Sequence, residues 1–124
     1  MWTETYDLHS HSTHSDGEHP VEHVGHLMAG NGVQTWALTD HDTASGWVEA
    51  SQVAKVNGMT FIPGVEITCT PAHPPMDEEL TKRERERASA SWHLLAYFPN
   101  HVPGKTDESV ASFLEWLAPK QDGR

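Results

Sequence analysis

The chain has 124 residues and a net charge of −10 with His neutral, because 18 Asp and Glu residues outnumber 8 Lys and Arg residues. This length fits one domain but is too short for a complete (β/α)8 barrel, which takes roughly 250 residues. The acidic balance argues against extended nucleic-acid binding through phosphates. No apolar run approaches the roughly 20 residues that a membrane span requires, which predicts a soluble protein. The chain has a single cysteine and lacks a secretory signal, which predicts a cytoplasmic location.

Short apolar runs alternate with amphipathic stretches in the first half of the chain. The pattern predicts an opening strand at Tyr6–Leu8 and a helix over residues 20–29 that begins at Pro20 and ends at a Gly-Asn-Gly stop. A second strand is expected at Thr35–Thr39, followed by a helix that Thr43 caps. Strands that alternate with helices in this way predict a parallel α/β sheet.

The second half continues the same pattern. Met59–Ile62 and Val65–Thr68 are expected to form a strand that a Pro-Gly pair interrupts, and Trp92–Phe98 is apolar enough for a strand buried on both faces. Thr106 can cap a final helix. We therefore expect one domain over residues 1–118, with neither an internal repeat nor a second domain.

Two segments stand apart from this domain. Residues 71–91 form a charged insertion, either a solvated loop or helix or a lid that faces the substrate. Residues 119–124 are expected to form a polar tail. The only clustered cations that could meet a phosphate lie in the insertion: Lys82, Arg83, Arg85 and Arg87.

Metal-binding side chains recur just after, or inside, the predicted strands. They are His9, His11 and Asp16 after the first strand, Asp40, His41 and Asp42 after the second, Glu66 in the third and His93 in the last. Neighbouring parallel strands bring their carboxyl ends to one rim, so ligands distant in sequence can converge on ions there. The recurrence predicts a metal cluster at that rim.

The individual residues leave alternatives open. A His-x-His pair is weak evidence in a chain with 10 histidines, but residues two apart in an extended segment point the same way, so His9 and His11 can share an ion. Asp42 could instead cap the second helix or orient an imidazole. A buried Glu66 is costly unless it is paired or metal-bound, and it could bridge two ions. His93 could be a core histidine bonded to a carbonyl.

Three further histidines, His19, His23 and His26, run at helical spacing along the first predicted helix. An independent surface zinc site is conceivable there. That helix should pack outside the sheet and away from the rim, so we expect all three side chains to be exposed to solvent.

Three segments together resemble the PHP family, named for polymerase and histidinol phosphatase. The segments are residues 6–17, with the Asp-Leu-His-Ser-His run and Ser-Asp-Gly, residues 38–43, with Thr-Asp-His-Asp, and residues 62–67, with Pro-Gly-Val-Glu. Family members are metal-dependent phosphoesterases on a distorted (β/α)7 barrel. The resemblance implies an α/β fold with a parallel-strand barrel of this type, of which only about the first half is present.

The resemblance also implies how ions would be held. His9, His11 and Glu66 would help hold one divalent ion, Asp16 and His41 a second, and His93 a third that shares Glu66. Two or three ions of Mn, Zn, Fe or Mg suit this mixture of imidazole and carboxylate ligands. The family's later histidines and aspartate and its substrate-binding arginine have no counterparts in this chain, so no substrate-binding residue is assigned.

The leading hypothesis is a metal-dependent phosphoesterase. Within the family the chain looks closest to the branch acting on nucleoside bisphosphates and short RNA 5′ ends, which predicts a phosphorylated small molecule or short oligonucleotide as substrate. In this scheme a metal-activated water attacks phosphorus, with Asp42 as a candidate to assist proton transfer. One alternative is a truncated, non-catalytic half-barrel that binds metal and self-associates through its open sheet edge. Another is an amidohydrolase, which can also begin with His-x-His after a first barrel strand.

Overall fold

The computed structural model describes residues 5–69 and 92–122, and for residues 121–122 it describes the backbone alone. The charged insertion predicted at residues 71–91, with its four clustered cations and the proposed lid, lies outside the described residues. Among the described residues, none of the helices combines the length and the apolarity needed to span a bilayer.

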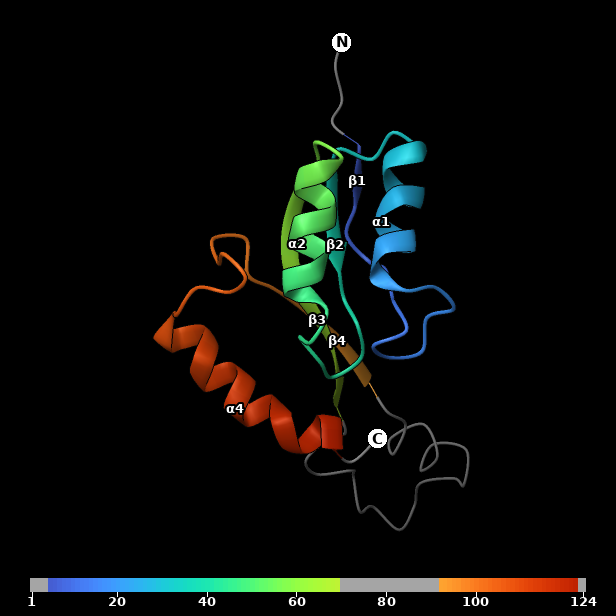
Figure 1. The fold of residues 1–124 in the computed structure, drawn as a ribbon. Coiled ribbons are helices and arrows are strands. Elements are labelled where there is room, and N and C mark those ends of the chain that lie inside the picture. The colour runs from blue at the N-terminus through green and yellow to red at the C-terminus, as the bar shows by residue number, and fades with distance from the viewer. Residues whose placement is uncertain (1–4, 70–91, 123–124) are drawn as a thin grey trace, which may run out of the picture.

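A curled sheet with helices against it forms the fold (Figure 1). The strands lie in the order β1-β2-β3-β4, and α1 and α2 lie side by side against them while α4 crosses near the other end of the sheet. The elements are β1 (Tyr6–Asp7), α1 (Val21–Gly30), β2 (Thr35–Leu38), α2 (Trp47–Val56), β3 (Thr60–Cys69), β4 (Trp92–Tyr97) and α4 (Glu108–Asp122). This mixed α/β architecture of a partial barrel confirms the predicted fold class.

The direction of β4 differs from the prediction. β1, β2 and β3 run parallel, as the alternation of strands and helices predicts, but β4 pairs antiparallel with β3. Apolar patterning identifies a strand without defining its direction, which depends on contacts distant in the sequence. In this register Leu95 faces Glu66 and His93 faces Thr68. His93 therefore lies beside the carboxyl-terminal half of β3, although it is near the start of its own strand.

The third strand is continuous, whereas an interruption at the Pro-Gly pair is predicted. β3 runs without interruption through Pro63 and Gly64, and the carbonyl oxygen of Pro63 accepts the Phe98 N–H at 2.8 Å. A Cβ on Gly64 would come within 2.8 Å of the Thr39 side chain and 3.2 Å of the Ala96 carbonyl oxygen. Glycine thus allows the close backbone approach that keeps the strand continuous at this point.

Both predicted helix caps are wrong. α2 begins at Trp47 rather than just after Thr43, because the Thr43 hydroxyl accepts the Ser45 N–H at 3.1 Å in a local turn. Asp107, rather than Thr106, holds the start of α4: its Oδ1 accepts the Ser109 N–H at 3.1 Å and the Ser109 hydroxyl at 2.7 Å. The hydrogen bond from the Ser109 hydroxyl lowers the pKa of Asp107. These turns depend on hydroxyl and carboxylate orientation, which residue type alone does not define.

The end of α4 continues further than the sequence indicates. The helix passes through Pro119 to Asp122, where a polar tail is predicted from residue 119. Lys120 in its last turn donates to the carbonyl oxygen of Thr68 at 3.2 Å, and its ammonium lies 5.2 Å from the centre of the Trp116 ring. The hydrogen bond ties the end of the helix to the end of β3, whereas the contact with Trp116 lies within α4.

Two apolar clusters form the core. The first lies between α1, α2 and β2 and includes Trp36, whose side chain is fully buried. The second packs α4 against β3 through Val65, Ile67, Val110 and Leu117.

β4 is not buried on both faces, contrary to the prediction. Trp92 is 66% exposed and Leu94 is 59% exposed. These two side chains lie two residues apart and so share one face of the strand, which is exposed in its first half among the described residues.

Candidate metal centre

Glu66 lies at the middle of a group of imidazoles. Its Oε1 is 2.5 Å from His9 Nε2 and 3.8 Å from His11 Nε2. Its Oε2 is 2.9 Å from His41 Nδ1 and 3.3 Å from His93 Nδ1. Each oxygen of this buried carboxylate therefore faces two histidines, and the histidines come from the ends of β1 and β2 and from β4.

Asp16 extends the cluster on the other side of two of these rings. Its Oδ2 is 3.2 Å from His41 Nε2, and its Oδ1 is 3.6 Å from His11 Nδ1. The rings of His11 and His41 stack with their centres 4.5 Å apart. His41 thus directs one nitrogen toward Asp16 and the other toward Glu66, which makes it the link between two parts of the cluster.

Six of the predicted ligands form three overlapping groups, and the ligand atoms within each group lie within 4.8 Å of one another. His11, His41 and Glu66 each belong to two groups. The groups are His9, His11 and Glu66; His11, Asp16 and His41; and His41, Glu66 and His93. Shared members make these groups neighbouring positions in one cluster rather than separate sites.

Buried nitrogen atoms test whether the cluster fits metal ions. Nδ1 of His11 and Nδ1 of His41 are buried and have no hydrogen-bond partner among the described residues, although carboxylate oxygens lie 3.6 Å and 2.9 Å away. Buried polar atoms are normally hydrogen-bonded, so such atoms need an explanation. Imidazole nitrogens and carboxylate oxygens gathered within a few ångströms of one another are the donors that divalent ions take. The residues therefore fit a cluster of divalent ions.

Electrostatics favours the ligand form of one histidine. Burial, with a further contribution from the neighbouring His41, lowers the pKa of His11. Its imidazole is therefore neutral at pH 7, which leaves a nitrogen lone pair available to a metal ion.

Asp40 lies outside the three groups. Its carboxylate is buried, and both oxygens accept hydrogen bonds from the loop before α1: Oδ1 from the Ser12 N–H at 2.6 Å and the Ser15 hydroxyl at 2.7 Å, and Oδ2 from the Ser12 hydroxyl at 2.7 Å. That Asp40 is a metal ligand stays a prediction from its place in the sequence. In the structure its carboxylate is hydrogen-bonded to the loop.

Asp42 also lies outside the groups. Its Oδ1 accepts the N–H of Thr68 at 2.8 Å, so it holds the segment after β2 against β3. The alternative that Asp42 caps the second helix is wrong, because Gly46 occupies that position. Asp42 has a left-handed backbone with φ 54°, and its own N–H donates to the Glu66 carbonyl oxygen at 3.1 Å. Its role in proton transfer stays a prediction.

Sequence reasoning missed Tyr97. Its hydroxyl donates to the carbonyl oxygen of Leu8 at 2.6 Å, which ties β4 to the residue before His9. Burial, with the negative charge of Glu66 as a second cause, raises the pKa of Tyr97 and keeps the phenol protonated as a donor. The signal was present in the period-two alternation along β4, which places Tyr97 on the same strand face as His93.

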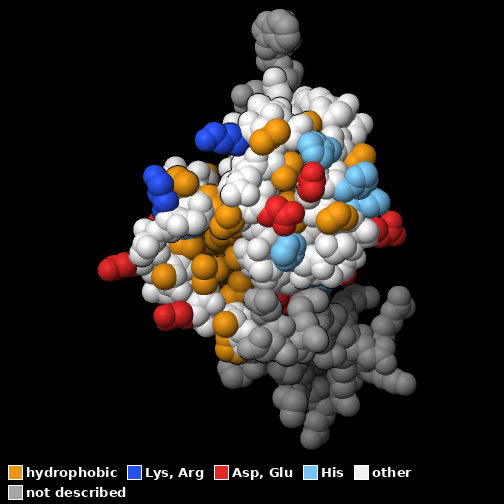
Figure 2. All heavy atoms as spheres, in the orientation of Figure 1, with side chains coloured by type: hydrophobic (Ala, Val, Ile, Leu, Met, Phe, Trp, Pro, Cys, Tyr) orange, Lys and Arg blue, Asp and Glu red, His pale blue; other side chains and the backbone are white. Residues whose placement is uncertain are grey.

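The histidines just before and on α1 are exposed, which confirms the prediction for them. His19, His23 and His26 lie on the surface, and Figure 2 shows histidine and acidic side chains gathered over α1. The rings of His19 and His23 lie 4.5 Å apart, but neither residue belongs to a three-ligand group among the described residues. These side chains are separate from the rim cluster.

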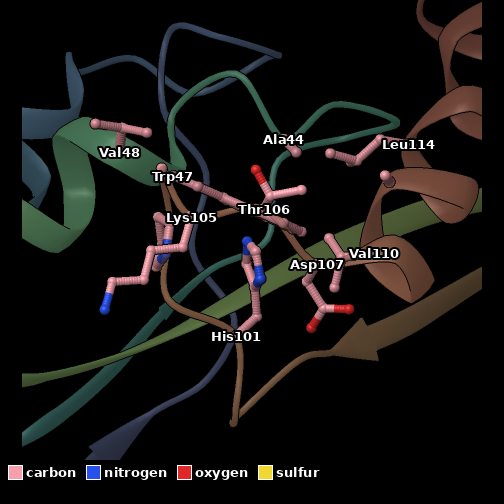
Figure 3. A pocket seen from close by; sticks show the side chains of 12 residues that line it. Ala44, Trp47, Val48, His101, Lys105, Thr106, Asp107, Val110 and Leu114 are labelled. Atoms are coloured by element: carbon pink, nitrogen blue, oxygen red, sulfur yellow. The ribbon is translucent and has the colours of Figure 1, made fainter.

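A pocket of about 320 Å³ lies elsewhere, between α2 and the start of α4 (Figure 3). Trp47 and His101 point into it, and Val110 and Leu114 line the side formed by α4. Hydrophobic side chains gather in the same region of the surface in Figure 2. Since none of the clustered ligands lines this pocket, it does not belong to the candidate metal centre.

Gly17 provides a test of the loop that carries two of the ligands. A Cβ at this position would lie 2.6 Å from both the carbonyl carbon and the carbonyl oxygen of His11, a clash with backbone that no side-chain rotation relieves. We expect Gly17→Ala to displace His11 and Asp16 and to weaken Mn²⁺ binding roughly 10-fold or more, measured by calorimetric titration. Gly30→Ala is the control, because a Cβ there meets nothing within 4 Å. Equal metal affinity in the two variants would contradict the expectation.

The fold and the cluster define a class: a partial α/β barrel that carries histidine and carboxylate ligands at one rim. Residues 7–117 match the PHP domain, and the chain belongs to this family. A curated relative, the 5'-3' exoribonuclease Rnm of Salmonella typhimurium, is 35% identical over 117 residues, which cover 80% of this chain and 40% of the relative.

Two solved structures resemble the chain. A protein of Bifidobacterium adolescentis described as a metal-dependent phosphoesterase superposes with a TM-score of 0.63 and 26% identity over 94% of this chain and 32% of that one. An amidohydrolase of Chromobacterium violaceum, with bound sulfate and no metal, superposes with a TM-score of 0.63 and 25% identity over 90% of this chain and 32% of that one. The chain therefore spans about two fifths of the curated relative and a third of the solved structures.

Proposed function

We propose that this chain binds two or three divalent metal ions at the rim cluster and provides the metal-binding part of a phosphoesterase. The proposed substrate is a nucleoside bisphosphate or the phosphorylated end of a short oligonucleotide. The observation that carries the proposal is the set of three ligand groups linked through His11, His41 and Glu66. Family membership and the exoribonuclease relative support the phosphoester class.

Each clustered residue has a proposed role as a ligand. Glu66 presents both oxygens and can bridge neighbouring ions, with His9 and His11 on one side and His41 and His93 on the other. Asp16 completes the position between His11 and His41. Four imidazoles with two carboxylates favour manganese, iron or zinc over magnesium, which prefers oxygen ligands.

Charge balance supports metal ions as the partners of phosphate. The chain has a net charge of −10, and among the described residues the ion pairs of Asp16 and Glu66 are with histidines and not with Lys or Arg. An anionic phosphate would be repelled by Asp16 and Glu66 unless bound cations reversed the local charge. When bound, such ions neutralise phosphate oxygens and lower the pKa of water.

The cluster is open to solvent on one side. The side chains of His9, His93 and Asp16 are 53%, 47% and 64% exposed, whereas that of Glu66 is 7% exposed. A buried bridging carboxylate with exposed ligands around it leaves one side of the cluster accessible to a substrate. Tyr97 and Asp42 hold the surrounding segments in place through their bonds to Leu8 and Thr68.

Hydrolysis tests the proposal directly. We expect the purified chain to release phosphate or nucleotide from a 3′,5′-nucleoside bisphosphate or a 5′-phosphorylated RNA oligomer, to lose this activity after EDTA, and to regain it with Mn²⁺, as measured by chromatography of the products. Phosphate release that persists after complete metal removal would contradict the proposal. Metal binding without turnover would instead favour the non-catalytic half-barrel, and the mass of the protein in solution would then show whether copies associate.

A second candidate function has one observation in its favour. One solved structure of the same fold is described as an amidohydrolase. The same metal centre could activate water for attack on an amide carbon instead of phosphorus. Amide and phosphate substrates assayed side by side at equal metal content separate these reactions, since the proposed function requires turnover of the phosphate ester and none of the amide.

A further inference from the structure

We propose that Asp40 is a positioning residue rather than a metal ligand: its buried carboxylate holds the loop that carries Asp16 so that Asp16 lies against His41. The inference rests on the proposed function, because it concerns the ion held by His11, Asp16 and His41. It assigns Asp40 a role different from the one that its place in the sequence predicts.

The contacts of Asp40 are directed to one loop. Its side chain is bonded at both oxygens to Ser12 and Ser15, with three donors between 2.6 and 2.7 Å. The residue is 2% exposed, and a carboxylate offers about four lone-pair directions. Three of these are therefore in use within the protein, and the bonds are charge-assisted and short.

The loop geometry connects these bonds to the metal ligands. Ser12 directly follows His11, and Ser15 directly precedes Asp16, so Asp40 holds the residue next to each ligand. The Ser12 carbonyl oxygen also accepts the N–H groups of Ser15 and Gly17 at 3.0 and 2.9 Å, which closes the loop on itself. Asp16 is itself 64% exposed at its side chain, so its position depends on this loop rather than on burial.

Asp40 also links the loop to the strand that carries the bridging carboxylate. Its carbonyl oxygen accepts the Glu66 N–H at 3.2 Å, and the next residue, His41, forms a parallel bridge with Glu66. The backbone of Asp40 is thus attached to β3 while its side chain holds the loop. This arrangement sets the separation between Asp16 and His41, whose nearest ligand atoms are 3.2 Å apart.

The dependence should be selective. The group of His41, Glu66 and His93 contains no residue of the loop, whereas the group of His11, Asp16 and His41 contains two. A weakened hold on the loop should therefore lower the affinity for one ion and leave the ion near His93 unchanged. A general loss of folding would instead weaken every ion together.

Mn²⁺ titration of the whole chain tests this, with calorimetry for affinity and electron paramagnetic resonance for coupling between neighbouring ions. We expect Asp40→Asn to weaken the ion of His11, Asp16 and His41 roughly 10- to 100-fold and to remove its spin coupling to the neighbouring ions, while the ion near His93 binds as in the wild type. Ser15→Ala should weaken the same ion to a smaller extent, and Ser15→Thr, which keeps the hydroxyl, should restore it. Thermal melting without metal checks that each variant folds.

The outcomes separate this inference from the function on which it rests. A wild-type chain that binds no Mn²⁺ overturns the proposed function. A wild-type chain that binds Mn²⁺, with Ser15→Ala equal to it, overturns the role of Asp40 through the loop, and so does equal weakening of all ions. If Asp40→Asn does not fold, the Ser15→Ala and Ser15→Thr pair decides alone, because Ser15 is only partly buried and its truncation leaves the Asp40 carboxylate with both of its bonds to Ser12.

Discussion

Glu66→Gln is expected to abolish binding of most of the metal, with the affinity for Mn²⁺ lowered by at least roughly 100-fold. This loss is larger than the one caused by removing a residue that only hydrogen-bonds to a metal ligand. One carboxylate serves two of the three ligand groups, and an amide can neither bridge two ions with negative charge nor direct two acceptor oxygens at four imidazoles. The number of ions per chain, measured by atomic absorption after dialysis at a defined free Mn²⁺ concentration, checks this. Hydrolysis of the proposed phosphate ester should be lost in parallel.

The metal-free fold should survive this change. The side chain of Glu66 is 7% exposed. The substitution removes its negative charge but leaves an amide of nearly the same shape among the same histidines. Mn²⁺ should raise the Tm of the wild type and not that of Glu66→Gln, because only a bound ligand shifts the unfolding equilibrium. Glu22→Gln is the matched control, since Glu22 is an exposed partner of His26 on α1. Wild-type metal stoichiometry in Glu66→Gln would contradict the bridging role.

Trp36→Ala is expected to lower the free energy of unfolding by about 3–5 kcal/mol. Trp36 is completely buried, and its ring packs edge-on against Phe61 with the ring centres 5.4 Å apart. Alanine would leave a large cavity between the helices and β2. Domains of this size are stable by only about 5–15 kcal/mol, so the variant should unfold at a much lower urea concentration. Chemical denaturation followed by circular dichroism measures the change.

The same substitution should disturb the metal centre. The indole N–H of Trp36 donates to the Ser10 hydroxyl at 2.9 Å, and that hydroxyl donates to the Ala37 carbonyl oxygen at 2.8 Å. Ser10 lies between His9 and His11, so its anchoring sets the position of both ligands. Trp116→Ala is the control, because Trp116 is 53% exposed and should cost little stability. A Trp36→Ala variant as stable as this control would show that the first apolar cluster does not hold the fold together.

Local spacing accounts for what could be predicted of the site. The His-x-His pair and Asp16 follow the first strand, His41 follows the second and Glu66 lies in the third, as the sequence indicates. Parallel strands make their carboxyl ends neighbours whatever lies between them in the chain. The convergence of His9, His41 and Glu66 therefore follows from chain order and strand periodicity, and the structure places these three side chains within contact distance.

Hydrogen-bond partners were beyond the reach of the sequence. Asp40 and Asp42 flank His41 and look alike as candidate ligands, yet one carboxylate bonds to Ser12 and Ser15 and the other to Thr68. Side-chain direction at a turn depends on backbone dihedrals, and the left-handed φ of Asp42 is not encoded in its residue type. The helix caps were missed for the same reason.

The residue types and their order alone determined which side chains could bind metal, that they follow successive strands, and the family to which they belong. Only the tertiary structure decided how His93 joins them. A parallel β4 would place this residue, near the start of its strand, at the end of the sheet away from Glu66, and the antiparallel pairing instead sets their ligand atoms 3.3 Å apart. Strand direction depends on pairing between segments far apart in the chain, and local periodicity carries no information about it.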